Sequence, residues 1–463
     1  MLRIQHSKFK LPDGMRVLRH ILLLWLLSAS LMLLCGCQPS SPVAGGVIHL
    51  TLWQGVNPPP NRDVLQKLVD RFNQEHPTIQ VESLYVGQGD QQLPKILAAI
   101  VGNAVPDLLW YAPMLTGQLV ELNAIYPLDD WWHKSSIRNE VDPALLESMQ
   151  LEDHIWSVPF GTNNVGIFYR PSLFKAAGIT KPPETWDELR QVARQLTRDN
   201  NGDGRPDQHG MLLPLGKGEW TVFTWLPFMW SGGGYLVAGS GDRGQGSGER
   251  ISSLLSPKVN SKFKIDLANS GAIAALDLWR ALVQDGSAIL SGPERGYELD
   301  GFLAGKVAMQ LTGPWTLGQL QTTGVDFAVM PIPAGAKQAT AVGGENLFVM
   351  KTTPEREQAA LTFAEYVLSE PFQTQWAIGT GYLPVNLKSR TSSEYEAFKT
   401  KQPAVEMFLQ QTKYGRSRPI FPGYNRISEN LGRAIEATLM NQSPPLEALE
   451  ASQKRLNLIF EQE

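Results

Sequence analysis

The fold is decided by residues 47–111, which read VIHLTLWQGVNPPPNRDVLQKLVDRFNQEHPTIQVESLYVGQGDQQLPKILAAIVGNAVPDLLWY. Two strand-like stretches, 47–53 and 79–86, are separated by a segment whose apolar residues recur at helical spacing. A second helical segment, 91–101, leads to the apolar stretch 108–111. Strands that alternate with helices along a chain favour a parallel sheet with crossover helices. The stretch therefore predicts an α/β fold.

The same alternation restarts later in the chain. A strand-like stretch at 165–169 is followed by Thr185 and Glu188, whose spacing is typical of a capping box that opens a helix to residue 197. Further strand-like stretches follow at 306–311, 327–332 and 346–350. A second α/β unit is therefore expected. Within the first unit, the proline-rich segment 57–61 predicts a break between the first strand and the first helix.

Composition excludes several classes of protein. The chain has 463 residues, 43% of them hydrophobic, which is enough for a packed globular protein. Its 41 Lys and Arg against 45 Asp and Glu give a net charge of -4, which argues against a nucleic-acid-binding surface. The two cysteines, Cys35 and Cys37, provide neither a disulfide framework nor a cysteine-based zinc site for the body of the protein. The sequence also lacks a nucleotide-binding P-loop motif and a G-x-S-x-G nucleophile motif.

The N-terminus has the features of an export signal. Arg16 and Arg19 precede an apolar run at 21–34, which has signal-peptide length and is shorter than the ~20 residues that span a bilayer. The run ends in Leu-Cys-Gly-Cys, which resembles a bacterial lipobox with Cys37 as the acylated residue. We therefore predict a lipoprotein signal peptide at 1–36 and a flexible tether at 37–46, with an uncleaved hydrophobic anchor as the alternative. Either way the body is expected outside the cytoplasmic membrane, in the periplasm or on the outer face of the plasma membrane.

Seven short motifs, taken in order, resemble a known family. They are the strand with Trp53, DRFNQEHP at 70–77, VPDL at 105–108, PETWDEL at 183–189, Gly-Pro-Trp at 313–315, Gly-Gly at 343–344 and GTGYLPV at 379–385. Together they resemble the family 1 extracellular solute-binding proteins of bacterial ABC importers, which include maltose-binding and glycerol-3-phosphate-binding proteins. The resemblance covers about residues 47–460.

The resemblance implies a two-lobe, type II periplasmic-binding-protein-like α/β fold, in which each lobe is a sheet flanked by helices. Lobe 1 would comprise 47–161 plus 347–396, and lobe 2 would comprise 162–341 plus 397–463. Strands crossing between the lobes near 161–164 and 342–346 would form the hinge. Several covalent crossings restrict two lobes to one closing motion.

Aromatic residues are the strongest chemical signal for a ligand. A sugar ring has an apolar C–H face and a polar rim, so flat aromatic faces beside amides and carboxylates suit it. By resemblance, Trp315 occupies the position that stacks on the ring, with Tyr111 facing it from the other lobe. Trp220 and Trp53 are further candidates. For each of these residues, burial in a core is the alternative.

Polar contacts are expected where the lobes meet. Asn163 falls where the resembled family has a carboxylate or a hydroxyl, so the amide is a departure that leaves the ligand open. Gly344 lets the backbone approach a ligand closely, and Glu345 follows it. Tyr382 and Tyr424 fall on contact positions of the resembled family.

A possible calcium loop follows the predicted capping-box helix. Asp199, Asn201, Asp203 and Asp207 supply oxygen atoms at positions 1, 3, 5 and 9 of an EF-hand-like pattern, whose position 12 is Gly210 rather than glutamate. An ordinary Asp/Asn/Gly turn is the alternative. The sequence thus predicts a possible structural Ca²⁺ and no required cofactor.

The resemblance implies a lipid-anchored, monomeric binding protein without enzymatic activity. It would capture a carbohydrate, either a mono- or oligosaccharide or a glycoside, and deliver it to a permease with separate ATPase subunits. One alternative is a binding protein for a polyol phosphate such as glycerol 3-phosphate. Another is a secreted glycosidase-like enzyme, which needs two opposed carboxylates, whereas the sequence offers Glu345 without an evident partner.

Overall fold

The computed structural model describes residues 46–237, 265–292 and 299–461. The predicted signal peptide at 1–36, Cys37 and all but the last residue of the predicted tether lie outside these ranges. By their contacts, residues 48–463 form one compact unit. In the described part of the chain, no helix combines the length and the apolar character needed to span a bilayer.

The first sheet contains the strands predicted from residues 47–111. Its order is β13-β12-β3-β1-β2, and β6 pairs with β12. The strands are β1 (Ile48–Gln54), β2 (Ile79–Tyr85), β3 (Leu108–Tyr111), β6 (Val158–Asn164), β12 (Thr340–Val349) and β13 (Gly415–Arg416). β1 is parallel to both β2 and β3, as predicted, whereas β12 is antiparallel to β3 and β6. The sheet is therefore mixed, because it also takes up strands from later in the chain.

Helix α2 (Pro59–Glu75) corrects one expectation. Residues 55–58 do separate β1 from the helix, but the break is shorter than predicted, because the helix already begins at Pro59. Proline is tolerated in the first turn, where its missing N–H has no intrahelical partner to lose. The apolar residues that predicted the helix, including Leu65, Leu68 and Phe72, are buried. α3 (Gly89–Val101) also forms where predicted.

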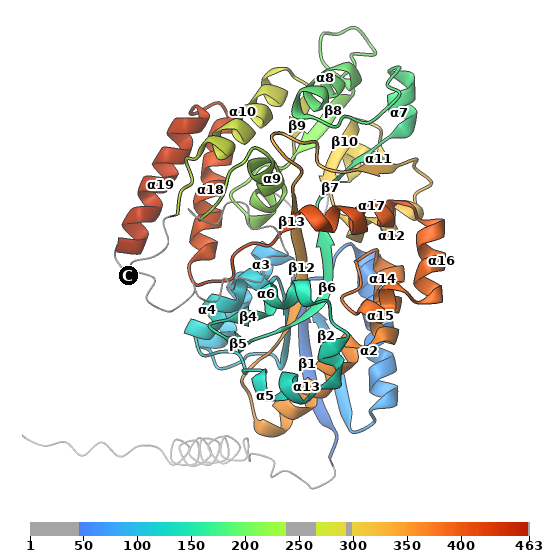
Figure 1. The fold of residues 1–463 in the computed structure, drawn as a ribbon, viewed down its shortest axis with the longest axis vertical. Helices are drawn as coiled ribbons and strands as arrows, with labels where there is room; N and C mark the ends of the chain where they lie inside the picture. The colour runs from blue at the N-terminus through green and yellow to red at the C-terminus, as the bar shows by residue number, and fades with distance from the viewer. Residues whose placement is uncertain (1–45, 238–264, 293–298, 462–463) are drawn as a thin grey trace, which may run out of the picture. The chain divides into compact units, whose positions relative to one another are not determined.

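The second sheet forms the second α/β unit. Its order is β11-β7-β10-β8-β9, and β8 is parallel to β9 and β10, while β7 is antiparallel to β10 and β11. The strands are β7 (Gly166–Tyr169), β8 (His209–Leu213), β9 (Ala288–Leu290), β10 (Val307–Thr312) and β11 (Ala328–Met330). Figure 1 shows this sheet in the upper half and the first sheet in the lower half, each flanked by helices.

Helix α8 (Trp186–Leu196) confirms the predicted capping box. The Thr185 side chain accepts a hydrogen bond from the Glu188 N–H, and the Glu188 side chain accepts one from the Thr185 N–H. Glutamate and threonine thereby satisfy two backbone donors that a helix start leaves unpaired.

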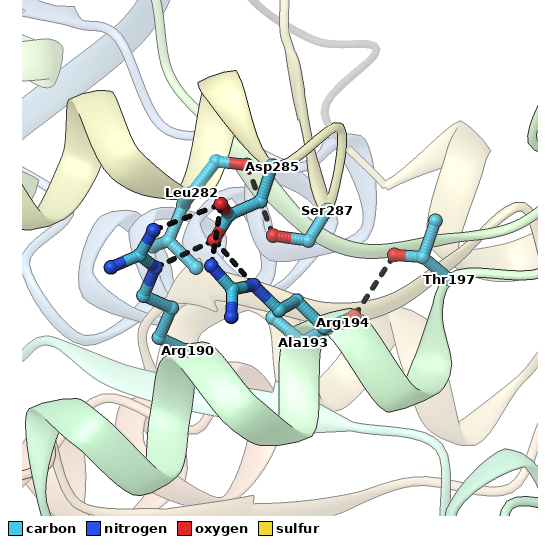
Figure 2. A network of polar contacts seen from close by, with 7 residues as sticks. All are labelled: Arg190, Ala193, Arg194, Thr197, Leu282, Asp285 and Ser287. Carbon is cyan, nitrogen blue, oxygen red and sulfur yellow. Dashed lines mark hydrogen bonds and ion pairs between the residues drawn. The ribbon is translucent and has the colours of Figure 1, made fainter.

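Helix α8 is tied to α10 (Ser270–Gln284) by two arginines that share one carboxylate (Figure 2). Arg190 and Arg194 each donate two hydrogen bonds to Asp285, at 2.6–2.9 Å. These hydrogen bonds hold the pKa of Asp285 well below its usual range. Charge-assisted bidentate bonds of this kind fix the two helices in one relative position.

The remaining elements surround the two sheets. They are α4 (Thr116–Glu121), α5 (Asp129–Lys134), α6 (Leu146–Met149), α7 (Pro171–Ala176), α9 (Glu219–Ser231), α11 (Asp300–Leu303), α12 (Leu317–Gln321), α13 (Pro354–Leu368), α14 (Glu370–Thr380), α15 (Leu387–Arg390), α16 (Ser393–Lys401), α17 (Ala404–Gln411), α18 (Tyr424–Leu439), α19 (Pro445–Glu461), the hairpin strands β4 (Gln150–Leu151) and β5 (His154–Ile155), and the 3₁₀ helices η1 (Pro113–Leu115), η2 (Ser136–Asn139), η3 (Pro143–Leu145), η5 (Pro314–Thr316) and η6 (Thr412–Tyr414).

Two strands of the first sheet, β6 and β12, are connected along the chain to strands of the second sheet. β6 belongs to the first sheet, and one residue after it β7 begins in the second sheet. β12 pairs antiparallel with β6, placing Val342 opposite Asn164 and Gly344 opposite Thr162. The two segments predicted as the hinge are thus paired with each other. The bending of these segments and the positions of the lobe boundaries stay predictions.

Candidate functional site

Two tryptophans from distant parts of the chain meet edge to face. Trp220 is the second residue of α9 and Trp315 lies in η5, with ring centroids 6.0 Å apart and planes at 74°. Both rings are partly buried. Gly313 makes this possible, since a Cβ there would collide with the Trp315 ring. The Trp315 carbonyl accepts a hydrogen bond from Asn61 Nδ2 of α2 at 3.0 Å, which ties η5 to the first α/β unit.

Trp53 and Tyr111 lie at one edge of the first sheet. Trp53 is near the end of β1 and Tyr111 ends the parallel neighbour β3. The carboxyl ends of parallel strands are where open α/β sheets bind ligands. Tyr111 is 5% exposed, and its hydroxyl donates to the Gly89 carbonyl at 3.1 Å. Burial raises the pKa of Tyr111, helped by the charges of Asp90 and Glu219.

Glu345 and Tyr382 form a hydrogen-bonded pair. The Tyr382 hydroxyl donates to Glu345 Oε2 at 3.0 Å. Burial raises the pKa of Glu345 to about 7, although the Tyr382 hydrogen bond and the Arg418 charge act to lower it. Burial and the Glu345 charge raise the pKa of Tyr382, whereas a hydrogen bond from Asn163 acts to lower it. The three predicted residues Asn163, Glu345 and Tyr382 therefore converge.

Glycines bring β6 and β12 close together at this point. Gly344 has φ +114°, and a Cβ there would collide with the Gly161 carbonyl oxygen. A Cβ at Gly343 would meet the Asn163 Oδ1 atom and the Phe223 ring. Asn163 is 3% exposed, and within the described residues its Oδ1 has no hydrogen-bond partner. A buried acceptor of this kind is a ready contact for a ligand donor.

A second polar group centres on Glu219, the first residue of α9. Arg418 Nη1 and the Tyr424 hydroxyl donate to Glu219 Oε1 at 2.6 and 3.2 Å, and Ser428 Oγ donates to Oε2. The Arg418 guanidinium also lies 4.3 Å from the centre of the Phe223 ring. We call Glu219, Arg418, Tyr424 and Ser428 the Glu219 cluster. It holds α9, α18 and the segment after β13 together.

A narrow cavity of about 20 Å³ lies beside the paired strands β6 and β12 and Arg418. It is lined by Gly161 and Thr162 of β6, Gly343 and Gly344 of β12, and Arg418, among others. A cavity of this volume holds about one water molecule. A sugar ring that reached these groups would therefore require the surrounding elements to move apart.

The comparison with known proteins decides the family. A family model described as bacterial extracellular solute-binding protein matches residues 67–405. The chain belongs to this family. The solute-binding protein is 22% identical over 399 residues to the maltotriose-binding protein of Pyrococcus abyssi, covering 84% of this chain and 77% of the relative. It is 21% identical over 438 residues to the sn-glycerol-3-phosphate-binding periplasmic protein UgpB of Escherichia coli, covering 90% and 93%.

Solved structures agree on the fold. A solute-binding protein of an ABC transporter from Thermotoga lettingae, bound with alpha-D-tagatose, superposes with a TM-score of 0.75 at 20% identity. The match covers 89% of this chain and 99% of that one. The predicted two-lobe, type II α/β fold and the predicted family are thereby confirmed, and this chain is an extracellular solute-binding protein.

The structure brings most of the predicted ligand residues of the solute-binding protein into two groups. Trp220 and Trp315 form one, and Asn163, Glu345 and Tyr382 form the other. Four predicted residues lie outside these groups. Trp53 and Tyr111 lie at the carboxyl ends of their strands in the first sheet, and Gly344 lines the cavity. Tyr424 is almost fully buried and donates a hydrogen bond to Glu219. That any of them touches a ligand stays a prediction.

Sequence reasoning missed Glu219 and Arg418. They lie 199 positions apart, so no spacing pattern connects them. The one available signal was a carboxylate directly beside Trp220 at a helix start.

The predicted calcium loop lies between α8 and β8. The Asp199 carboxylate accepts hydrogen bonds from the N–H groups of Gly202 and Gly204 at 2.7 and 2.8 Å, which lowers its pKa. Asp207 accepts one from the Asn200 N–H at 2.8 Å. Across the described ranges, no group of three His, Cys, Asp or Glu side chains is placed to hold a metal ion. Calcium binding by this loop stays a prediction.

Proposed function

We propose that this solute-binding protein captures a carbohydrate, a mono- or oligosaccharide or a glycoside, and delivers it to the permease of an ABC importer with separate ATPase subunits. The observation that carries the proposal is the Trp220–Trp315 pair, with Glu219, the residue next to Trp220 in α9, hydrogen-bonded to Arg418. Aromatic faces cover the C–H face of a sugar, while carboxylate, amide and guanidinium groups serve its hydroxyls. The relatives named for sugars support the same proposal of a carbohydrate ligand.

The proposed mechanism is closure of two lobes about β6 and β12. Trp53 and Tyr111 lie on β1 and β3 of the first sheet, whereas Trp220 and Trp315 lie on α9 and η5 of the second α/β unit. A ligand that touches both sets binds the closed arrangement more tightly than the open one. Its differential affinity then shifts the population toward closure, which is the form that a permease recognises.

We further propose that the body acts outside the cytoplasm as a monomer, anchored by a lipid on Cys37 after removal of residues 1–36. We infer that it has no glycosidase activity. Glu219 is the carboxylate that acts on Arg418 together with Glu345, but it already accepts hydrogen bonds from Arg418, Tyr424 and Ser428. We therefore assign Glu219 to holding these three side chains in place rather than to catalysis.

A binding panel tests the proposal. The mature protein is titrated calorimetrically and by thermal shift with glucose, maltose, maltotriose and tagatose. A ligand at 100 times its Kd adds about 2.7 kcal/mol of stability. Trp220→Ala should weaken binding, whereas Trp131→Ala, which removes a partly buried tryptophan on α5, should not. If no sugar raises the melting temperature over a broader panel of mono- and oligosaccharides, the carbohydrate proposal fails.

A further inference from the structure

The relatives include proteins named for neutral sugars and for a phosphate ester. The charge around Tyr111, Glu345 and Arg418, whose surroundings we call the cleft, therefore decides between two ligand classes. A phosphate ester needs uncompensated positive charge, usually from arginine. Arg418 is the arginine that lines the cavity beside the paired strands β6 and β12. Its side chain is 8% exposed, so its charge is poorly screened by water and interacts strongly with neighbouring charged groups.

The Arg418 charge is already compensated by protein groups. Glu219, 16% exposed, lies 2.6 Å away in an ion pair, and the Glu345 charge also acts on the guanidinium. The Phe223 ring covers one face of Arg418 at 4.3 Å. A ligand phosphate would have to compete with a carboxylate that three side chains hold in place.

A third carboxylate adds to the negative field. The charges of Asp90 and Glu219 both act on Tyr111, at the edge of the first sheet. Asp90 lies against Gly218, the residue that precedes Glu219, because a Cβ on Gly218 would collide with its Oδ2. Even without Glu345, whose surroundings favour the neutral acid, the described residues that act on Tyr111 include two carboxylates, Asp90 and Glu219, and one guanidinium, Arg418. A dianionic phosphate is repelled there, whereas a sugar hydroxyl can donate to a carboxylate and accept from Arg418 without net charge.

We propose that Glu219 determines the charge class of the ligand: by pairing with Arg418, it makes the cleft accept uncharged polyhydroxy compounds and reject their phosphate esters. The inference rests on the proposed function, because it assumes that this cleft is the solute site. It assigns a role to Glu219 that goes beyond the general capture of a carbohydrate.

The test compares matched pairs on the full mature protein. Glucose with glucose 1-phosphate, glycerol with glycerol 3-phosphate, and inorganic phosphate alone are titrated at constant ionic strength. In the wild type, we expect no phosphorylated compound to bind more tightly than its parent, and no stabilisation by phosphate beyond that of chloride. In Glu219→Gln, which keeps an acceptor for Tyr424 and Ser428, phosphate or its esters should bind at least tenfold more tightly than in the wild type.

Glu429→Gln is the matched control, because it removes one negative charge from exposed Glu429 on α18. It should not gain phosphate affinity. Tighter wild-type binding of either ester than of its parent overturns the inference, as does a folded Glu219→Gln protein without any gain. The wild-type arm can overturn the inference even if the variant does not fold. If no sugar binds but Glu219→Gln gains phosphate affinity, the carbohydrate proposal fails and the role of Glu219 stands.

Discussion

Glu345→Gln should change how the stability of this protein depends on pH. Glu345 lies on β12 beside Tyr382, and its surroundings favour the neutral acid because burial disfavours the anion more than Tyr382 and Arg418 favour it. Glutamine keeps the size and an acceptor for the Tyr382 hydroxyl but cannot ionise. The difference between the two proteins therefore isolates the ionisation of this one carboxyl group.

The magnitude follows from the pKa. In the folded protein the pKa of Glu345 rises from the ordinary 4.5 to about 7, and one pKa unit is worth about 1.36 kcal/mol. Between these two values the folded state holds a proton that the unfolded state has lost, so stability falls as pH rises. The contribution of Glu345 is fully present below about pH 4.5 and lost above about pH 7. The total change is about 3 kcal/mol.

The assay is guanidinium unfolding of both proteins at pH 5, 6, 7 and 8. Relative to Glu345→Gln, the wild type should lose about 3 kcal/mol of unfolding free energy between pH 5 and pH 8. Glu140→Gln is a control that should stay constant over this range, because the hydrogen bond from Lys388 lowers the pKa of Glu140 and its contribution is lost only as pH falls below about 4.5. A wild-type-minus-variant difference at Glu345 that stays constant across this range would refute the reasoning.

Four further outcomes are expected. Trp315→Ala should weaken sugar binding by about 2 kcal/mol, roughly thirty-fold in Kd; unchanged calorimetric affinity in the folded fraction would exclude stacking. Asp285→Asn should lower the free energy of unfolding at neutral pH by about 2 kcal/mol. Because the folded protein lowers the pKa of Asp285, the difference between wild type and variant in urea unfolding should shrink as pH falls below about 4. Cys37→Ser should release the protein from the membrane fraction and Cys35→Ser should not; equal retention of both would contradict lipidation at Cys37. If the loop at Asp199 holds calcium, a chelator should lower the melting temperature without abolishing saturated ligand binding, and no shift would indicate an ordinary turn.

Local patterns in the sequence predicted the elements well. The apolar periodicity of Leu65, Leu68 and Phe72 identified α2, and Thr185 with Glu188 identified the start of α8, because helix formation and capping depend on residues a few positions apart. The start of α2 was missed because its prolines were interpreted as a break in the chain. Proline also fits the first turn of a helix. The family resemblance supplied Asn163, Glu345 and Tyr382, which local patterns alone do not connect.

The sequence by itself therefore determined an α/β chain of strands, helices and caps, together with its family. The tertiary structure alone decided that β12 enters the first sheet antiparallel and that Glu219 pairs with Arg418. The physical reason is that a hydrogen bond within a turn or a helix is fixed by neighbours along the chain. A buried ion pair between residues 199 positions apart is fixed only when packing excludes water and brings the two charges together.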